Sequence, residues 1–507
     1  MAKGIKLRLP EHIPFRYVWP VVGFLFGLQM LEGTKLITSL AYCGFIVVMT
    51  DAFNASGGLV YPSGGYIFFL GLLTVILGGV AKTALGEPLD SHLFNAQKSM
   101  LVYLAGSCAI WGAARISAAT RRKRPFLAKT QLTSNLDQVA MGALLVGFFG
   151  AQLVPIAYRS TFNQMNQFVT LSLLLSVYST TKKSNGNQSF SWFSVLLWFV
   201  LTTWWGIFDY SKTGIFAPSF SWAIGAVLGG YRLTVRRAAF AGGLFLLMSV
   251  FLTPVSQMGR VYRGMENSND IAMDMVLHPL RTREQYEQRQ LQDIAEAKLN
   301  YRWFDHSQGL MDRLTMFPID DALIHRTDQG YSPGLFPIMT NITNMVPRYL
   351  VGEKPLWHWG NRYAHEIGLL GRYDTDTGVS FGAFADGYHE LRWWGVTLVS
   401  LPIYLMMFWF CDSLTGSTHD TIWAAIYILL FAHFAPEGML GTPFSAVSTL
   451  AFMMCFLAVT GRYVLPVLGG IVIPRSRLQS LPIPPVRWQP RPAPTLRTVP
   501  RTIEEKL

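Results

Sequence analysis

Apolar runs long enough to cross a bilayer, or nearly so, recur along almost the whole of this 507-residue chain. Nine precede residue 256 and three follow residue 393, at about 15–31, 35–52, 65–82, 99–115, 136–157, 163–179, 189–208, 214–231, 239–255, 394–411, 421–438 and 446–468. A hydrocarbon core about 30 Å thick needs roughly 20 apolar residues in a helix. The sequence therefore predicts an all-α polytopic membrane protein with about 12 transmembrane helices.

One long polar segment, residues 256–393, interrupts this pattern. It holds 18 Asp and Glu against 14 Lys and Arg, whereas the rest of the chain holds 12 against 28. Within it, residues 281–300 are rich in strong helix formers and predict an exposed helix. We expect four parts: a transmembrane domain of about nine helices, a mostly helical external loop that carries the chemistry, a transmembrane domain of three helices and a tail, at 1–255, 256–393, 394–469 and 470–507.

The placement of basic residues predicts the orientation. Twelve spans with a cytoplasmic N-terminus put the basic tail and three further clusters on the cytoplasmic side: Arg121 to Arg124, Lys182-Lys183, and Arg232 with Arg236-Arg237. This arrangement agrees with the positive-inside rule, which also accounts for the net charge of +12 without nucleic acid as a partner. We expect a multi-pass protein of a bacterial inner membrane, with both termini cytoplasmic and a periplasmic loop.

The tail, the cysteines and the loop histidines bear on whether the chain has a disulfide framework, a metal site or a further binding segment. The tail after residue 470 is rich in Pro and basic residues, which predicts a disordered segment near anionic lipid, with partner binding as the alternative. All four cysteines lie in apolar runs, so we expect neither a disulfide framework nor a cysteine-based zinc site. The six histidines of the loop lack zinc-binding spacing, and we expect no metal and no cofactor.

Two arginines at the start of the loop are candidates for binding a phosphate. Arg260 and Arg263 lie three residues apart, and therefore on one face if the ninth helix continues. At the outer headgroup level, two guanidinium groups could grip a lipid-linked phosphate in bidentate fashion. The alternative is ordinary anchoring of arginine at a helix end.

Motifs follow one another in a distinctive order in the second half of the loop. An apolar segment with helical spacing carries Arg313, and a Val-Pro-Arg turn ends at Arg348. Lys354-Pro355 follows six residues later, and Gly387-Tyr388 stands ahead of Trp393-Trp394-Gly395.

Over about residues 310–400 this order resembles the Wzy-type oligosaccharide repeat-unit polymerases, which include the O-antigen polymerases. In that family such motifs bracket the second half of a large periplasmic loop and lead into the next membrane helix. The chain departs from the family at three positions, where Asp386, Glu390 and Arg392 replace the usual Glu, Asn and Gly.

The resemblance implies a GT-C-like membrane glycosyltransferase. Such an enzyme transfers an oligosaccharide from one polyprenyl-pyrophosphate carrier to the terminal sugar of another, in contact with membrane lipid, and a chain-length regulator protein is a further partner. An O-antigen ligase, which transfers the glycan to lipid A-core, is one alternative. A flippase or other transporter is another, for which broken helices near the midplane are expected.

The pyrophosphate leaving group needs cations, and the acceptor hydroxyl needs a base. We expect Arg313 and Arg348 to be catalytic, with Lys354 in support. For the base we consider Asp320, Asp321 and His325. Helix capping after Pro318 is the alternative for the aspartates, and a surface or pocket-wall position is the alternative for the histidine.

A second group of residues is expected to contact substrate. Asp386, His389 and Glu390 are further candidates for the base, and Asp386 with Tyr388 is expected to bind substrate. Aromatic faces stack on sugar rings, so Trp357 and Trp359 are candidates for sugar binding, although interfacial belts give a similar composition.

Overall fold

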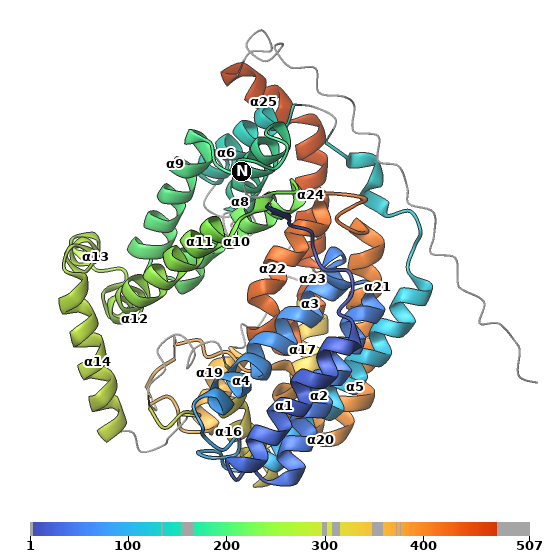
Figure 1. Ribbon diagram of the computed structural model, residues 1–507, viewed down its shortest axis with the longest axis vertical. Coiled ribbons are helices and arrows are strands. Elements are labelled where there is room, and N and C mark those ends of the chain that lie inside the picture. Colours follow the sequence, from blue (N-terminus) through green and yellow to red (C-terminus); the bar gives the residue numbers. More distant parts are fainter. Residues whose placement is uncertain are drawn as a thin grey trace, which may run out of the picture. The chain divides into compact units, whose positions relative to one another are not determined.

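The structure is a computed structural model that describes residues 4–132, 135–153, 166–296, 302–306, 315–346, 358–371, 373–375 and 377–473 (Figure 1). Arg313, Arg348, Lys354, Trp357 and the tail after residue 473 lie outside the described residues. The described chain is mostly helical and contains helices able to cross a membrane, as the sequence predicts.

Within the described residues, six helical stretches are long and apolar enough to span a bilayer. They are α2 (Leu36–Ser56), α3 (Pro62–Gly71) with α4 (Leu77–Ala84), α5 (Ala96–Thr120), α11 (Val235–Leu247) with α12 (Thr253–Gly259), α20 (Ala383–Trp394) with α21 (Ser400–Thr415), and α23 (Gly441–Val447) with α24 (Thr449–Tyr463). Helices suit this environment because every backbone polar group in lipid must be satisfied within the protein.

Other helices of the same part of the chain are shorter. Four are apolar: α1 (Phe15–Leu31), α6 (Leu136–Leu153), α9 (Trp192–Leu201) with its π-helical continuation Thr202–Phe208, and α22 (Trp423–Glu437). Three more complete the set outside the polar segment: α8 (Asn166–Lys183), α10 (Lys212–Leu228) and α25 (Leu465–Val472).

The polar segment is itself helical where it is described. Its helices are α13 (Ser268–Leu277), α14 (Pro279–Glu296), α16 (Phe317–Asp328), α17 (Phe336–Met345) and α19 (Trp359–Glu366). Helix α14 confirms the helix predicted over 281–300 up to residue 296, and most of its side chains described up to residue 289 are exposed.

Two short strands add a feature that an all-α prediction does not contain. Strand β1 (Ile5–Lys6) pairs antiparallel with β2 (Arg232–Leu233), and the Leu7 N–H donates to the Tyr231 carbonyl at 2.8 Å. The pair joins the start of the chain to the connection between α10 and α11.

Several long helices are interrupted. Five-residue π-helical turns occur at Leu72–Ile76, Met248–Leu252 and Gly395–Val399. Such turns are rare overall, but those that occur often lie at functional sites. The interruption at 395–399 follows a kink in α20, and it adjoins the residues that form the site.

Aromatic packing positions α16 and α20 against α5. The ring of Tyr103 in α5 contacts Phe317 of α16 at 5.2 Å and Phe384 of α20 at 5.1 Å between centroids. Gly106, one turn further along α5, leaves room for Phe384, because a Cβ there would lie 2.2 Å from the ring. These contacts place the polar residues of α16 and α20 in a common interior (lower part of Figure 1).

Candidate functional site

Asp320 is completely buried where α16, α5 and the start of α20 meet. Its carboxylate accepts hydrogen bonds from the Tyr103 hydroxyl and, at 2.8 Å, from the Gly382 backbone N–H that precedes α20. Burial raises the pKa of Asp320 to about 7, and the neighbouring charges of Asp386 and Asp321 act in the same direction. Asp320 therefore keeps its proton to a much higher pH than an exposed aspartate does.

Asp321 belongs to α16, and its side chain lies against the N-terminus of α5. It accepts from the backbone N–H groups of Phe94 at 2.5 Å and Asn95 at 3.2 Å, and from the Ser99 hydroxyl at 2.6 Å. A carboxylate in this position satisfies donors that a helix start leaves open. The sequence suggested that the aspartate pair caps its own helix, whereas Asp321 caps a different one.

Two buried carboxylates stand four residues apart on α20. The Leu440 N–H donates to one oxygen of Asp386 at 2.8 Å, while the other oxygen lies near the Tyr363 hydroxyl without an aligned hydrogen bond among the described residues. Glu390 is 1% exposed, and neither of its oxygens has such a partner. A buried carboxylate with incomplete hydrogen bonding is costly, which makes this pair a candidate for the functional site.

His389 lies between these two carboxylates in sequence and is fully buried. Its Nδ1 is 2.9 Å from the Thr327 hydroxyl, and its Nε2 is 3.1 Å from the Glu366 carboxylate. Burial opposes ionisation of Glu366, but His389 and Arg362 hold the pKa of Glu366 below its usual value. Because both ring nitrogens have partners, His389 positions α19 against α20 and has no nitrogen left to take a proton from a substrate.

Tyr388 belongs to a second polar contact between the same helices. Its hydroxyl donates to Asp328 at 3.0 Å, and Lys98 forms an ion pair with Asp328 at 2.6 Å. The Lys98 ammonium also lies 5.4 Å from the Tyr388 ring centroid. This network joins α5, α16 and α20.

His325 and Trp359 lie at the margins of the site. The imidazole of His325 stacks on Phe94 at 5.1 Å, and its Nε2 is 3.0 Å from the Gln329 amide. Trp359 is 8% exposed, and its ring packs against Phe336 and Tyr363. Its placement favours a packing role over an open sugar-binding face.

Arg260 and Arg263 lie at the end of α12, on an exposed surface. Arg263 donates to the backbone carbonyl of Asp209, next to the π-helical end of α9. A second nitrogen contact of Arg263, to the Tyr210 carbonyl at 3.5 Å, involves the same connection after α9.

The backbone departs from helical geometry beside the carboxylates. Arg392 has φ 52° and ψ −136°, a conformation that favours glycine, and it breaks α20 just after Glu390. Met439, in the connection between α22 and α23, also has φ 52°. It precedes Leu440, whose N–H donates to Asp386. Two helix breaks therefore flank the pair Asp386 and Glu390.

Two ionisable residues of α22 form a partly exposed rim. His433 and Glu437 lie 3.8 Å apart, and the Ser380 hydroxyl donates to Glu437 at 3.4 Å. Ser380 stands three residues before α20, so this rim adjoins the start of the helix that carries the carboxylates.

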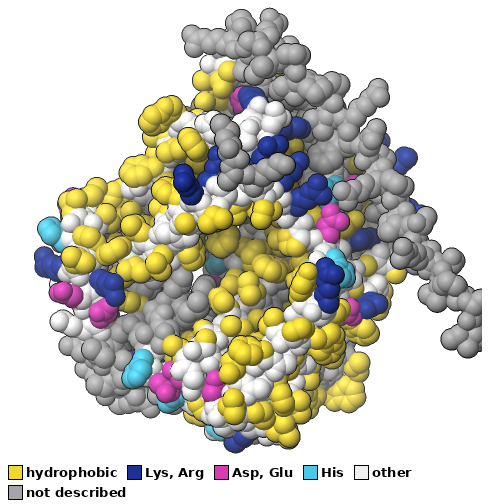
Figure 2. Space-filling model, viewed as in Figure 1, with side chains coloured by type: hydrophobic (Ala, Val, Ile, Leu, Met, Phe, Trp, Pro, Cys, Tyr) yellow, Lys and Arg dark blue, Asp and Glu magenta, His cyan; other side chains and the backbone are white. Residues whose placement is uncertain are grey.

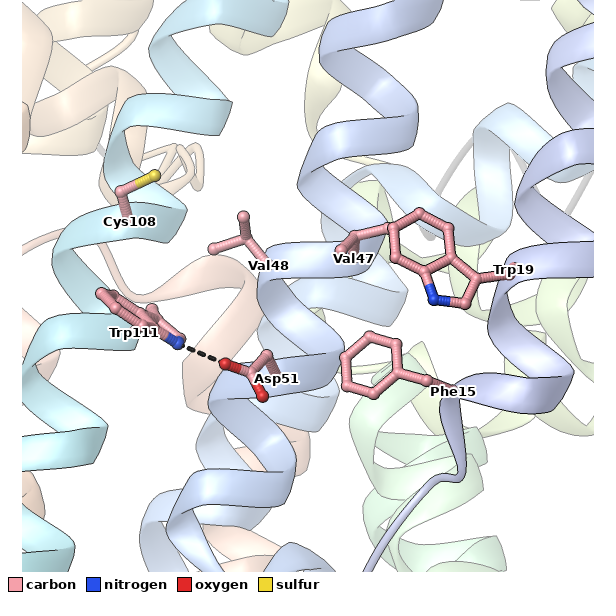
Figure 3. A pocket seen from close by; sticks show the side chains of 7 residues that line it. All are labelled: Phe15, Trp19, Val47, Val48, Asp51, Cys108 and Trp111. Carbon is pink, nitrogen blue, oxygen red and sulfur yellow. Dashed lines mark hydrogen bonds between the residues drawn. The ribbon is translucent and has the colours of Figure 1, made fainter. Parts of the chain in front are cut away.

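A separate apolar groove of about 550 Å³ lies between α1, α2 and α5 (Figure 3). Its lining residues are Phe15, Trp19, Val47, Val48, Asp51, Cys108 and Trp111. The Trp111 indole and the Arg115 guanidinium donate to Asp51 at 2.6 and 2.7 Å, so the carboxylate is satisfied within the protein. The groove offers apolar surface and does not include the residues of α16, α19 or α20.

Within the part of the chain that the structure describes, no group of His, Cys, Asp or Glu is arranged to hold a metal ion. Sequence reasoning missed Tyr103 and Glu366, because Tyr103 lies in an apolar run and Glu366 belongs to no motif. A motif search gives no signal for either residue, and only the packing of α5 and α19 reveals them.

Four of the carboxyl groups described above, together with His389, form what we call the carboxylate cluster: Asp320, Asp386, His389, Glu390 and Glu366. Its members come from α16, α19 and α20. Comparison with family models, curated proteins and solved structures finds no match to this chain.

Proposed function

We propose that this protein is a membrane glycosyltransferase that polymerises polyprenyl-pyrophosphate-linked oligosaccharide repeat units at the outer face of a bacterial inner membrane. The observation that carries the proposal is the buried pair Asp386 and Glu390, three of whose four carboxylate oxygens have no hydrogen-bond partner among the described residues, beside a break in α20. A sugar hydroxyl that attacks a lipid-linked donor must give up its proton, and a carboxylate in a dry site can accept it.

In this mechanism the pair Asp386 and Glu390 carries one negative charge, and its ionised member accepts the proton of the acceptor hydroxyl. Asp386, on the same face one turn earlier, is held by the Leu440 N–H, and its closeness to Glu390 disfavours a second negative charge, so the pair holds one proton before the transfer and two after it. The new glycosidic bond forms as the bond to the donor pyrophosphate breaks. Arg313 and Arg348 are proposed to stabilise the departing pyrophosphate, with Lys354 in support.

The backbone at Arg392 supports the motif correspondence. The family pattern has Gly at this position, and here the position has a positive φ that favours glycine. The glycine that the family has at this position therefore has a physical reason, since the backbone here adopts a glycine-type conformation. This agreement supports the polymerase proposal for α20.

The wider architecture belongs to the same proposal. We propose that the shorter apolar helices complete about twelve spans in a GT-C-like arrangement, with both termini cytoplasmic. The substrate, a chain-length regulator protein and membrane lipid are the proposed partners.

A proton-coupled transporter of a lipid-linked saccharide is the second candidate. Two observations favour it: unpaired carboxylates within a candidate membrane span, and the breaks at Arg392 and Met439 that discontinuous transport helices also show. The two functions make different predictions about where the repeat unit accumulates.

The test substitutes Glu390→Gln in the natural host and resolves surface and lipid-linked glycans by size. A polymerase that loses its base should fall in rate by about 10²-fold or more. Single repeat units should then accumulate on the outer face, with long chains lost. Glu287→Gln, on the exposed face of α14, is the matched control and should leave glycan lengths unchanged.

The alternatives give distinct results. Repeat units confined to the cytoplasmic face would indicate a transporter, and accumulation of long lipid-linked chains would indicate a ligase. Normal glycans of every length with Glu390→Gln would exclude a role for Glu390 in either transfer or transport.

A further inference from the structure

A polar pocket of about 490 Å³ lies where the N-terminal strand meets the ends of α8 and α10. Its lining residues are Lys6, Tyr178, Lys182, Asn185, Leu228, Gly229, Gly230 and Arg232. Figure 2 shows Lys and Arg side chains gathered in the upper part of this face, around the place where Figure 1 marks the N-terminus. The carboxylate cluster lies elsewhere, on α16, α19 and α20.

The pocket concentrates positive charge without a balancing carboxylate. Lys6, Lys182 and Arg232 line it, and no Asp or Glu does. Among the described residues none of the three forms an ion pair. By contrast Lys183, the neighbour of Lys182, pairs with Asp137 outside the pocket. Lys183 therefore has a carboxylate partner, whereas Lys182 lines the cavity without one among the described residues.

The strand register increases this concentration of charge. Lys6 is directly opposite Arg232 in the antiparallel pair. Like charges in directly opposite positions destabilise a sheet. A positive-inside distribution explains how many cations this end of the protein carries, but it does not require two of them to be cross-strand partners in a concave site.

The shape of the pocket is also specified. Gly230 has φ 75°, and a Cβ there would lie 2.5 Å from the Lys6 side chain. Glycine at this position therefore lets the lysine stem lie against the backbone. The Lys182 ammonium lies 5.5 Å from the Tyr178 ring centroid and donates to the Tyr178 hydroxyl at 3.5 Å, so the tyrosine positions the ammonium beside the cavity.

We propose that Lys6, Lys182 and Arg232 form a phosphate-binding site at this end of the protein. Three cations around one cavity suit a phosphate monoester or diester, which would relieve the cross-strand repulsion and accept charge-assisted hydrogen bonds. The phosphate comes either from the headgroup of an anionic lipid or from a soluble phosphate compound. The site is independent of the proposed transfer reaction.

The experiment uses the full chain in nanodiscs. In one arm the bilayer is phosphatidylcholine with phosphatidylglycerol, and native mass spectrometry counts the phosphatidylglycerol retained after mild delipidation. In the other arm the bilayer is phosphatidylcholine alone, and binding of radiolabelled inorganic phosphate is measured. Lys182→Gln and Arg232→Gln are expected to weaken binding about tenfold or more, since each removes a charge-assisted contact.

Matched variants separate the site from general charge. Arg236→Gln removes one positive charge from an exposed position outside the pocket and should retain binding. Lys182→Arg keeps the charge and should also retain it, which distinguishes loss of the site from loss of the fold. Selective loss of phosphatidylglycerol identifies a headgroup site, and selective loss of phosphate identifies a soluble ligand. Equal binding by Lys182→Gln and Arg236→Gln in both arms would overturn the proposal.

Discussion

At the scale of single residues, the most consequential feature is the number of carboxylates that the protein buries at one place. Asp320 and Asp321 each obtain donors from other elements, whereas Asp386 and Glu390 keep oxygens without protein partners among the described residues. The first two stabilise the structure around the site. The second two form the proposed site of proton transfer, and the cost of burying them must be offset by the packing of α20.

Asp320 predicts a pH dependence of stability. In the folded protein the pKa of Asp320 is about 7, whereas its ordinary pKa is 3.8. Between these values the folded state binds more protons than the unfolded state, so this group lowers the free energy of unfolding as pH rises. Asp320→Asn removes that contribution. The unfolding temperature of Asp320→Asn, relative to that of the unsubstituted protein, should therefore rise from about pH 4 to about pH 7.

The control for this prediction is Glu287→Gln, because Glu287 is an exposed carboxylate. Its pH profile should follow that of the unsubstituted protein. Parallel profiles for Asp320→Asn and the unsubstituted chain would contradict a raised pKa at Asp320.

Arg392 predicts a stabilising substitution. A non-glycine residue in such a backbone conformation costs about 1–3 kcal/mol, and glycine removes the strain at an entropic cost of about 0.5–1 kcal/mol. Arg392→Gly should therefore raise the free energy of unfolding by about 1 kcal/mol, measured by thermal unfolding in detergent. Leu391→Gly is the matched control, since Leu391 has φ −136° and gains nothing from glycine. A lower unfolding temperature for Arg392→Gly would show that its side-chain contacts outweigh the strain.

At the scale of elements, α5 depends on a residue that lies more than 200 positions away. Asp321 supplies the acceptors for the Phe94 and Asn95 N–H groups and for Ser99. Asp321→Ala leaves these donors buried without partners and should lower the free energy of unfolding by about 2 kcal/mol or more. Asp274→Ala, at an exposed position of α13, should change it little, and equal effects of the two variants would argue against the cap.

Elements were predictable from sequence where one local property decides them. The predicted runs at 35–52 and 99–115 correspond to α2 and α5, and the helix formers of 281–300 correspond to α14, because propensity and hydropathy act over adjacent residues. The start of the helix at Ala383 lies eleven residues before the run at 394–411. Hydropathy misses this extension because the polar residues Asp386, His389 and Glu390 face the protein interior.

The candidate site was predictable only in part. The motif around Gly387-Tyr388 directed attention to α20, and the structure places the unpaired carboxylates there. The contributions of Tyr103, Thr327 and Glu366 depend on helices that meet across long sequence separations. A pattern confined to one segment contains no information about such meetings.

At the scale of the whole molecule, the proposed topology is open to a direct test. Three apolar helical stretches separate Asn187 from Asn269: α9, α10 and α11 with α12. An odd number of crossings puts the two positions on opposite sides. In a chain lacking its four native cysteines, an impermeant maleimide added to intact cells should label Asn269→Cys and not Asn187→Cys. Labelling of both, or of Asn187→Cys alone, would contradict the proposed orientation.

The pairing of β1 with β2 has a consequence for the order of assembly. Residues 5–7 are synthesised before their partners at 231–233, which emerge only after more than 200 further residues. Closing so long a loop carries an entropic cost that local helices do not bear. Strand β1 therefore takes its final place late in biogenesis, after the helices between the two strands have been made.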